Sequence, residues 1–155
     1  MGTRSSIAVK HGDKIKAVYC HWDGYLDHNG IILSKCYSSA LANNLVALGN
    51  ISSLGATIGA KHDFDTPNAE REFVDIGPVS VNKETTFYGR DRGEEDSEYR
   101  VFHSEAEWID TMEASGCEYF YLMDSDVWYV CTGGNLMLLH DALEDQHFSE
   151  EIEND

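Results

Sequence analysis

Residues 118–131 read EYFYLMDSDVWYVC, and this stretch is the strongest structural signal in the chain. Two runs rich in aromatic and β-branched residues flank the polar triplet Asp124-Ser125-Asp126. Aromatic and β-branched side chains favour strands, whereas Asp and Ser favour tight turns. The stretch therefore predicts a β-hairpin with strands over residues 118–123 and 127–131.

A second hairpin is predicted near the start of the chain. Residues 6–9 and 15–19 alternate well enough for two strands, and His11-Gly12-Asp13 supplies a turn between them. Residues 85–88 and 99–103 predict further strands. Residues 51–78 show little periodicity and contain both prolines, so they predict a long surface loop with short helical turns.

Helix signals occur in three segments, at residues 31–48, 104–114 and 136–146. The first has apolar side chains at helical spacing, and Ser38-Ser39 divides it into two helices. Ser104 and Glu107 form a capping box that starts the second helix. Because predicted hairpins dominate and no βαβ alternation is seen, the predicted fold class is α+β, an antiparallel β-sheet built of hairpins with helices packed on one side.

The chain of 155 residues is long enough for one domain, and its three Trp, eight Tyr and six Phe can build a core. We expect a single globular domain over residues 1–148 and a flexible acidic tail over residues 149–155. No stretch reaches the roughly 18 apolar residues of a membrane span, and the start of the chain lacks the apolar segment of a signal peptide. A cytoplasmic location is therefore expected.

The formal net charge of −17 is concentrated in one region of the sequence. Residues 101–155 hold fourteen Asp or Glu and no Lys or Arg, whereas residues 1–60 hold five basic and three acidic residues. A field of one sign attracts partners of the opposite sign. The candidate partner-binding face consists of Glu105, Glu107, Asp110, Glu113, Asp124, Asp126, Asp141, Glu144 and Asp145.

Two interpretations of this acidic region stay open. Duplex DNA carries one charge per roughly 1.7 Å of its axis, and carboxylates spread over a helix, a hairpin and a second helix could imitate that density. Such a surface would occupy the basic cleft of a nucleic-acid-binding protein. The alternative is an acidic surface that only keeps the protein soluble. Direct binding of nucleic acid to this face is disfavoured, because phosphates would be repelled.

A second set of residues could bind a small ligand. Residues 19–30 contain two His and two Asp, and residues 88–93 place two Arg on a turn flanked by Gly. The candidate ligand-binding residues are Thr3, Arg4, His21, Asp23, Tyr25, Arg90 and Arg92. The alternative is structural: the Asp side chains hold turns, the aromatic residues pack, and the arginines pair with the acids at positions 94–96.

Catalytic and metal-binding signatures are missing from the sequence. It has no Walker A loop, GxGxxG, GxSxG or HExxH pattern, and its four Cys form no CxxC pair. Reduced, mostly buried thiols are favoured over a disulfide or a zinc site. We therefore expect a protein that is not an enzyme and that has no cofactor and no metal.

Several motifs resemble a family of small uncharacterised proteins that are frequent in bacteriophages and mobile elements. They are the opening GTRS at residues 2–5, VYCHWDGY at 18–25, LGNISSL at 48–54 and TFYGRDRGE at 86–94. The resemblance covers most of residues 2–95 and implies no catalytic residue. It implies a genomic context in which small accessory proteins often counter host systems.

The expected function is that of a phage-type counter-defence protein, acting in the host cytoplasm, whose acidic surface binds and inhibits a basic, DNA-handling host protein, by DNA mimicry or otherwise. The alternative is a small-molecule or nucleotide-binding protein, or an enzyme, whose site is built from the GTR, HWDGY and GRDRG motifs. The aromatic hairpin at residues 118–131 also hints at a homo-oligomer. No membrane partner is expected.

Overall fold

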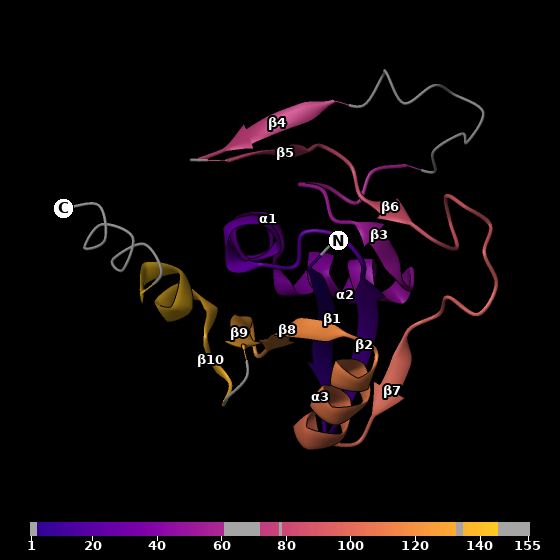
Figure 1. Cartoon of the computed structure of the whole chain (residues 1–155), viewed down its shortest axis with the longest axis vertical. Coiled ribbons are helices and arrows are strands. Elements are labelled where there is room, and N and C mark those ends of the chain that lie inside the picture. The colour runs from indigo at the N-terminus through magenta and orange to yellow at the C-terminus, as the bar shows by residue number, and fades with distance from the viewer. Residues whose placement is uncertain (1–2, 61–71, 78, 133–134, 146–155) are drawn as a thin grey trace.

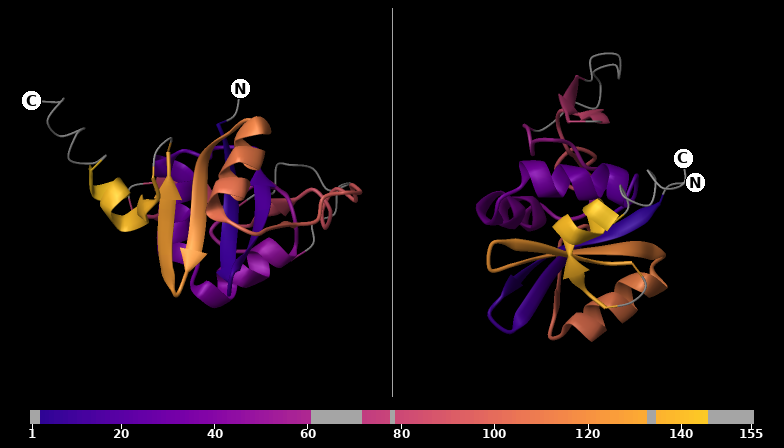
Figure 2. Two further views of the ribbon diagram at one scale, coloured as in Figure 1. Left: turned by 90° about the horizontal axis from the view of Figure 1, so that it is seen from below. Right: turned by 90° about the vertical axis from the view of Figure 1, so that its left-hand side faces the viewer.

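The structure is a computed structural model that describes residues 3–60, 72–77, 79–132 and 135–145. The acidic tail predicted at residues 149–155 lies outside the described residues. Figures 1 and 2 show one sheet with helices on both of its faces. The predicted α+β class is confirmed.

One eight-stranded sheet contains most of the strands that the structure describes (Figure 1). Its order is β10-β9-β8-β1-β2-β3-β6, and β7 also pairs with β2. The strands are β1 (Arg4–His11), β2 (Lys14–Cys20), β3 (Ile51–Ser53), β6 (Thr86–Phe87), β7 (Arg100–Phe102), β8 (Cys117–Asp124), β9 (Val127–Cys131) and β10 (Met137–Leu138). A separate hairpin consists of β4 (Phe73–Ile76) and β5 (Val79–Asn82).

The helices cover both faces of this sheet. A π-helical turn η1 (Leu26–Gly30) leads into α1 (Ile31–Cys36) and α2 (Ser39–Ala47), which lie on one face, while α3 (Glu105–Ala114) lies on the other (Figure 2). Residues 139–145 form a further helix on the same side as α1. The prediction that helices pack on one side only is therefore wrong.

The sheet is mixed, so the prediction of a purely antiparallel sheet is also wrong. β1 pairs in parallel with β8, and β2 pairs in parallel with β3. Parallel strands require long crossover connections. One crossover runs from β2 through α1 and α2 to β3, and the other runs from β7 through α3 to β8. Each crossover carries its helices over a different face, which explains why both faces are buried.

The local predictions of hairpins and caps are confirmed. β8 and β9 pair up to Asp124 and Val127, and the turn residues Ser125 and Asp126 have φ of 51° and 66°, as a type I′ turn requires. β1 and β2 form the opening hairpin. The side chain of Ser104 accepts a hydrogen bond from the backbone of Glu107 at 3.1 Å, which confirms Ser104 as the N-cap. The Glu107 carboxylate accepts a hydrogen bond from the backbone of His103 at 3.0 Å, one residue before the partner that the predicted capping box requires.

Other boundaries differ from the predictions. The segment at residues 31–48 does divide into two helices, and the Ser38 hydroxyl caps the second. The loop predicted at residues 51–78 contains β3 and β4 in its described part. The last helix begins at residue 139 and not at residue 136, because Met137 and Leu138 pair with β9 as an edge strand.

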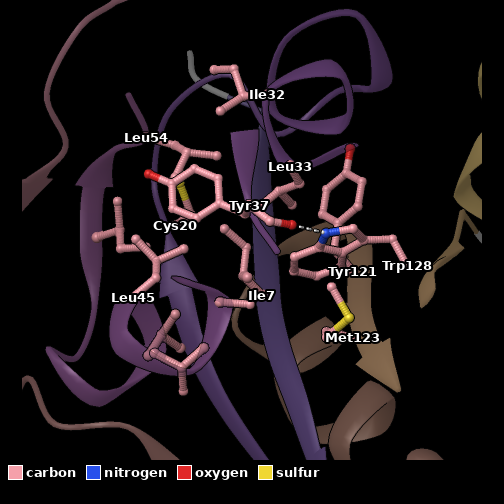
Figure 3. Close-up of a cluster of buried hydrophobic side chains, with 14 of the residues drawn as sticks. Ile7, Cys20, Ile32, Leu33, Tyr37, Leu45, Leu54, Tyr121, Met123 and Trp128 are labelled. Atoms are coloured by element: carbon pink, nitrogen blue, oxygen red, sulfur yellow. Dashed lines mark hydrogen bonds between the residues drawn. The ribbon is translucent and has the colours of Figure 1, made fainter. Parts of the chain in front are cut away.

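The first core lies between the sheet and α1, α2 and residues 139–145. Figure 3 shows side chains of Ile7 and Tyr121 from the sheet meeting Leu33 and Leu45 from the helices. The indole nitrogen of Trp128 donates a hydrogen bond to the backbone oxygen of Tyr37 at 2.9 Å (Figure 3). This bond satisfies the polar atom of a buried Trp and ties β9 to the α1–α2 junction.

The second core lies under α3. Trp108 is fully buried there, and its ring meets Phe120 in a T-shaped contact with 5.8 Å between centroids. Its indole nitrogen donates a hydrogen bond to the hydroxyl of Ser6 at 2.9 Å, and that hydroxyl donates to the backbone oxygen of Val18 at 2.9 Å. The buried polar groups are therefore paired, and α3 is fixed over β1 and β2.

Candidate functional site

The candidate site lies where the β1–β2 ladder ends. Ser5 pairs with Cys20, so Arg4 and His21 are the next two residues across this antiparallel pair. Opposite residues of such a pair point to the same face of the sheet. Beyond them the chain folds back, and the backbone of Gly24 donates a hydrogen bond to Thr3 at 2.7 Å. The charge of Arg4 lowers the pKa of His21, which places the two residues near one another at this end of the ladder.

His21 is held between two aromatic side chains. The Tyr19 hydroxyl lies 2.8 Å from Nδ1 of His21, and the Trp22 ring meets the imidazole in a T-shaped contact with centroids 4.7 Å apart. Burial lowers the pKa of His21, and the positive charges of Arg4 and Arg92 lower it further. Burial raises the pKa of Tyr19. Both side chains are therefore neutral at pH 7.

Arg92 reaches the same place from a distant part of the sequence. Its guanidinium lies over the ring of Tyr88 at 5.3 Å from the centroid. Asn50 joins this segment to β2, because its backbone oxygen accepts a hydrogen bond from Tyr88 at 3.1 Å and its side chain accepts one from the Tyr19 backbone at 2.9 Å. These bonds place the turn that carries Arg92 beside Tyr19 and His21.

The Arg4 guanidinium is exposed and has no hydrogen-bond or ion-pair partner among the described residues. It lies against Gly116, just after the carboxyl end of α3: a Cβ built on that glycine would be 2.8 Å from an Arg4 nitrogen. A cation at this end of a helix is favourable. This contact explains the position of Arg4, and it leaves the guanidinium donors open to a ligand.

Arg90 does not belong to the site. Its guanidinium donates hydrogen bonds to the backbone oxygens of Ile58, Gly59 and Thr85 and forms an ion pair with Asp91 at 3.0 Å. The buried Asp91 also accepts a hydrogen bond from the Phe87 backbone at 2.7 Å. Arg90 therefore holds loops together, and the sequence-based alternative of pairing with residues 94–96 is replaced by the pair with Asp91.

Asp23 and Tyr25 lie on the adjoining loop. The backbone of Asp23 has a φ of 57°, in the left-handed region that residues other than Gly rarely adopt. Burial raises the pKa of Tyr25, and the charge of Asp23 and a hydrogen bond to its carboxylate raise it further. Tyr25 also lies near the ring of His28, with centroids 6.1 Å apart, and the Asp23 backbone oxygen accepts a hydrogen bond from Asn29 at 3.3 Å, so both residues shape the loop that carries Trp22.

A buried polar network supports this loop from below. The side-chain amide of Asn29, which is fully buried, donates to the Ser5 hydroxyl at 3.3 Å, the Cys20 sulfur at 3.4 Å and the Trp22 backbone at 3.4 Å. The Tyr121 hydroxyl donates to the backbone oxygen of Gly24 at 2.7 Å. Burial and internal hydrogen bonds thus account for several of the polar and aromatic residues between positions 18 and 30.

The thiols show no sign of reactivity. All four cysteines lie among the described residues and none forms a disulfide there, and Cys20, Cys117 and Cys131 are buried. Burial raises the pKa of Cys20 to about 11 and that of Cys117 to about 12. Thiols of this kind stay protonated and are poor nucleophiles at neutral pH.

The acidic candidate residues do not form one continuous face. Four lie exposed on α3, three lie exposed in the helix at residues 139–145, and two lie at the tip of the β8–β9 hairpin. The sheet separates the first group from the second (Figure 2). At the tip, Asp124 is within 3.8 Å of Lys10. The predicted face is therefore three separate surfaces.

Comparison with protein families, with curated proteins and with solved structures finds no match for this chain. Among the described residues there is also no cluster of three or more His, Cys, Asp or Glu that could hold a metal ion. None of the described helices has the length and apolarity needed to cross a membrane.

Sequence reasoning identified Arg4, His21 and Arg92 but missed their aromatic neighbours. Tyr19 precedes His21 by two positions, and this spacing places both side chains on one face of a strand. That signal was present in the sequence. The sequence did not predict that Tyr88 lies near Tyr19, because this proximity depends on the hydrogen bonds that Asn50 makes to both segments.

Proposed function

We propose that this chain binds a phosphate-bearing small molecule at the cluster of Arg4, His21 and Arg92. The observation that carries the proposal is the convergence of two guanidinium groups and an imidazole from three separate segments. Burial is the largest cause of the lowered pKa of His21, and the positive charges of Arg4 and Arg92 lower it further, so both guanidinium groups act on the same ring. Like charges held together are unfavourable, and an anion between them would remove that cost.

The chemistry of the cluster suits a phosphate oxygen. Guanidinium groups offer several donors in a fixed plane and bind phosphate well. The Arg4 donors are open among the described residues, and the contact of Arg92 with Tyr88 fixes the direction of its guanidinium. The backbone beneath is held by the β1–β2 ladder and by Asn50, so little ordering is needed on binding.

The overall charge of −17 sets a condition on this proposal. An anionic ligand is repelled by the protein as a whole and attracted only locally. Exposed charges farther apart than about 10 Å are largely screened at an ionic strength of 0.1 M. We therefore expect binding to persist at moderate ionic strength, where the distant carboxylates are screened more than the adjacent guanidinium groups.

The test is isothermal titration calorimetry with inorganic pyrophosphate, supported by thermal unfolding. Arg4→Ala and Arg92→Ala should each weaken binding by about tenfold or more, as the loss of a charge-assisted hydrogen bond predicts. Lys14→Ala is the matched control, because it removes one positive charge at the opposite end of the same hairpin. Equal weakening by all three variants would show an effect of net charge alone and contradict the site.

A second candidate function is the inhibition of a basic, nucleic-acid-binding host protein in the manner of a phage counter-defence protein. It is favoured by α3, whose acidic residues Glu105, Glu107, Asp110 and Glu113 are all exposed on a helix without a Lys or Arg. Carboxylates three or four positions apart repel one another on a helix. A basic partner would relieve this repulsion.

Charge-reversal variants on the two sides of the sheet separate this function from general acidity. Replacing Glu105, Asp110 and Glu113 with Lys should abolish capture of a basic partner from bacterial lysate at low salt. The matched control replaces Asp141, Glu144 and Asp145, which lie across the sheet. If both triple variants lose capture equally, the acidic surface acts only through total charge and α3 is not a binding face.

A further inference from the structure

The surroundings of Trp22 indicate which class of ligand would bind at the cluster of Arg4, His21 and Arg92. This inference rests on the phosphate site proposed above and adds a second contact to it. Trp22 is 43% exposed, whereas Trp108 and Trp128 are 0% and 8% exposed. What distinguishes this exposed ring is its place, because it contacts His21 of the cluster with 4.7 Å between the ring centroids.

The backbone that carries the Trp22 ring is fixed on both sides. Its N–H donates a hydrogen bond to the backbone oxygen of Ser52 at 3.1 Å. Its carbonyl accepts hydrogen bonds from the side chains of Asn29 and Cys20 at 3.4 and 3.7 Å. The next residue, Asp23, is in the left-handed conformation. These hydrogen bonds fix the backbone from which the ring projects, and the T-shaped contact with His21 orients the ring before any ligand binds.

We infer that the ligand is a nucleoside phosphate whose phosphate binds Arg4 and Arg92 and whose unpaired base stacks on Trp22. Base–aromatic stacking needs an exposed, ordered ring, and a phosphate site next to it supplies the charge contact. A sugar joins base and phosphate, so one molecule can reach both groups. Inorganic phosphate or a sugar phosphate would leave the Trp22 ring in solvent.

Duplex nucleic acid does not fit the same site. Its bases are paired and stacked on each other, so none is available to Trp22 unless it is extruded. The protein also carries a net charge of −17, which opposes a long polyanion more than a single nucleotide. The expected ligand is therefore a free nucleotide or the end of a single strand, and the free nucleotide is the form tested below.

The experiment compares adenosine monophosphate, adenosine and pyrophosphate by calorimetry on the full chain. The monophosphate should bind at least about tenfold more tightly than either of the others, because only it makes both contacts. It should also quench tryptophan emission, and the quenching should come from Trp22, the one exposed tryptophan of the three.

Trp22 variants separate this inference from the phosphate site. Trp22→Ala should weaken the binding of the monophosphate by about tenfold and leave the binding of pyrophosphate unchanged. Trp22→Phe should keep most of the affinity for the monophosphate. Phe73→Ala, at an aromatic residue that is 65% exposed on the separate hairpin, is the matched control. It should change neither ligand.

Each remaining outcome overturns a defined claim. If pyrophosphate binds as tightly as the monophosphate and Trp22→Ala changes neither, the base contact is wrong and the phosphate site stands. If no ligand binds, or if Arg4→Ala leaves all affinities unchanged, the phosphate site fails and the base contact fails with it. Quenching that survives in Trp22→Phe would assign the signal to another tryptophan and contradict stacking on Trp22.

Discussion

The hydroxyl of Tyr19 lies 2.8 Å from Nδ1 of His21 at the end of the β1–β2 ladder. Burial is the largest cause of the pKa shift of each side chain, and the charge of Arg4 acts to lower both pKa values. The two residues are two positions apart on one face of the chain. The spacing of the pair is that of an ordinary strand, but the charges around it come from residues elsewhere in the sequence. The titration of the pair is therefore the most direct probe of the site.

We predict that His21 titrates below its ordinary pKa and that Arg4→Ala and Arg92→Ala each raise this pKa. Burial and the two positive charges oppose the protonated ring. The folded state thus binds fewer protons than the unfolded state just below pH 6.5, the ordinary pKa, so this group's contribution to stability is lost as the pH falls through that range. The measurement is the NMR shift of the His21 ring protons against pH. An unchanged pKa in both variants would contradict the cluster.

Arg90 and Arg92 should behave differently although they are two positions apart. Arg90→Ala leaves the buried carboxylate of Asp91 without its ion pair, and breaking a buried pair typically costs about 3 kcal/mol of the free energy of unfolding. Arg92 is exposed, so Arg92→Ala should cost about 1 kcal/mol or less. Urea unfolding measures both values. Equal costs would show that the two arginines have been assigned the wrong roles.

Trp108→Phe tests the bond that fixes α3 over the sheet. The substitution keeps an aromatic ring but removes the N–H that donates to Ser6 at 2.9 Å. The loss of a buried hydrogen bond and some packing should lower the free energy of unfolding by about 1–3 kcal/mol. Trp22→Phe, at the exposed tryptophan, is the control and should be close to neutral. A larger effect at position 22 would be the contrary result.

Alkaline pH should destabilise the fold through its buried thiols. The pKa of Cys20 is raised by burial from 9.0 to about 11 and that of Cys117 to about 12. The folded state keeps these protons where the unfolded thiols ionise, so stability falls as the pH rises above 9.0 and through the raised values. Urea unfolding from neutral pH to about pH 10.5 measures the slope. Cys117→Ala should make that slope shallower, and an identical slope would refute the assignment.

Gly24→Ala should disturb the loop that carries Trp22. A Cβ at this position would lie 2.7 Å from the Ser5 Cβ and 2.9 Å from the Thr3 backbone oxygen. Overpacking of this kind costs about 1–3 kcal/mol. Gly93→Ala is the comparison, because it has open space around it and only a positive φ, which costs about 1 kcal/mol. Thermal unfolding gives both values, and a smaller cost at position 24 would argue against the close approach.

Local physics explains which parts of the fold were predictable. The β8–β9 hairpin, the N-cap at Ser104 and the division near Ser38 each depend on residues within a few positions of one another. Their signals are short-range preferences for turns and caps, so the sequence carries them directly.

The sequence also held a signal that was misread. Residues 5–9 of β1 are all buried, and four consecutive residues of β8, from Phe120 to Met123, are buried as well. Runs without polar alternation are typical of strands covered on both faces. These buried runs agree with helices on both sides of the sheet. The prediction treated them as hairpin strands with one exposed face, and the two kinds of strand differ only in what packs against them.

By itself, then, the sequence determined the α+β class, the main hairpins, the starts of α2 and α3 and the regional charge. Only the tertiary structure decided that β1 pairs in parallel with β8 and that the acidic residues of α3 and of residues 139–145 are separated by the sheet. It also decided that Arg4 and Arg92 lie close enough to His21 to lower its pKa, while Arg90 forms an ion pair with Asp91. The physical reason is that these relations join residues tens of positions apart. Crossover helices and hydrogen bonds such as those of Asn50 fix them, and no local preference encodes either.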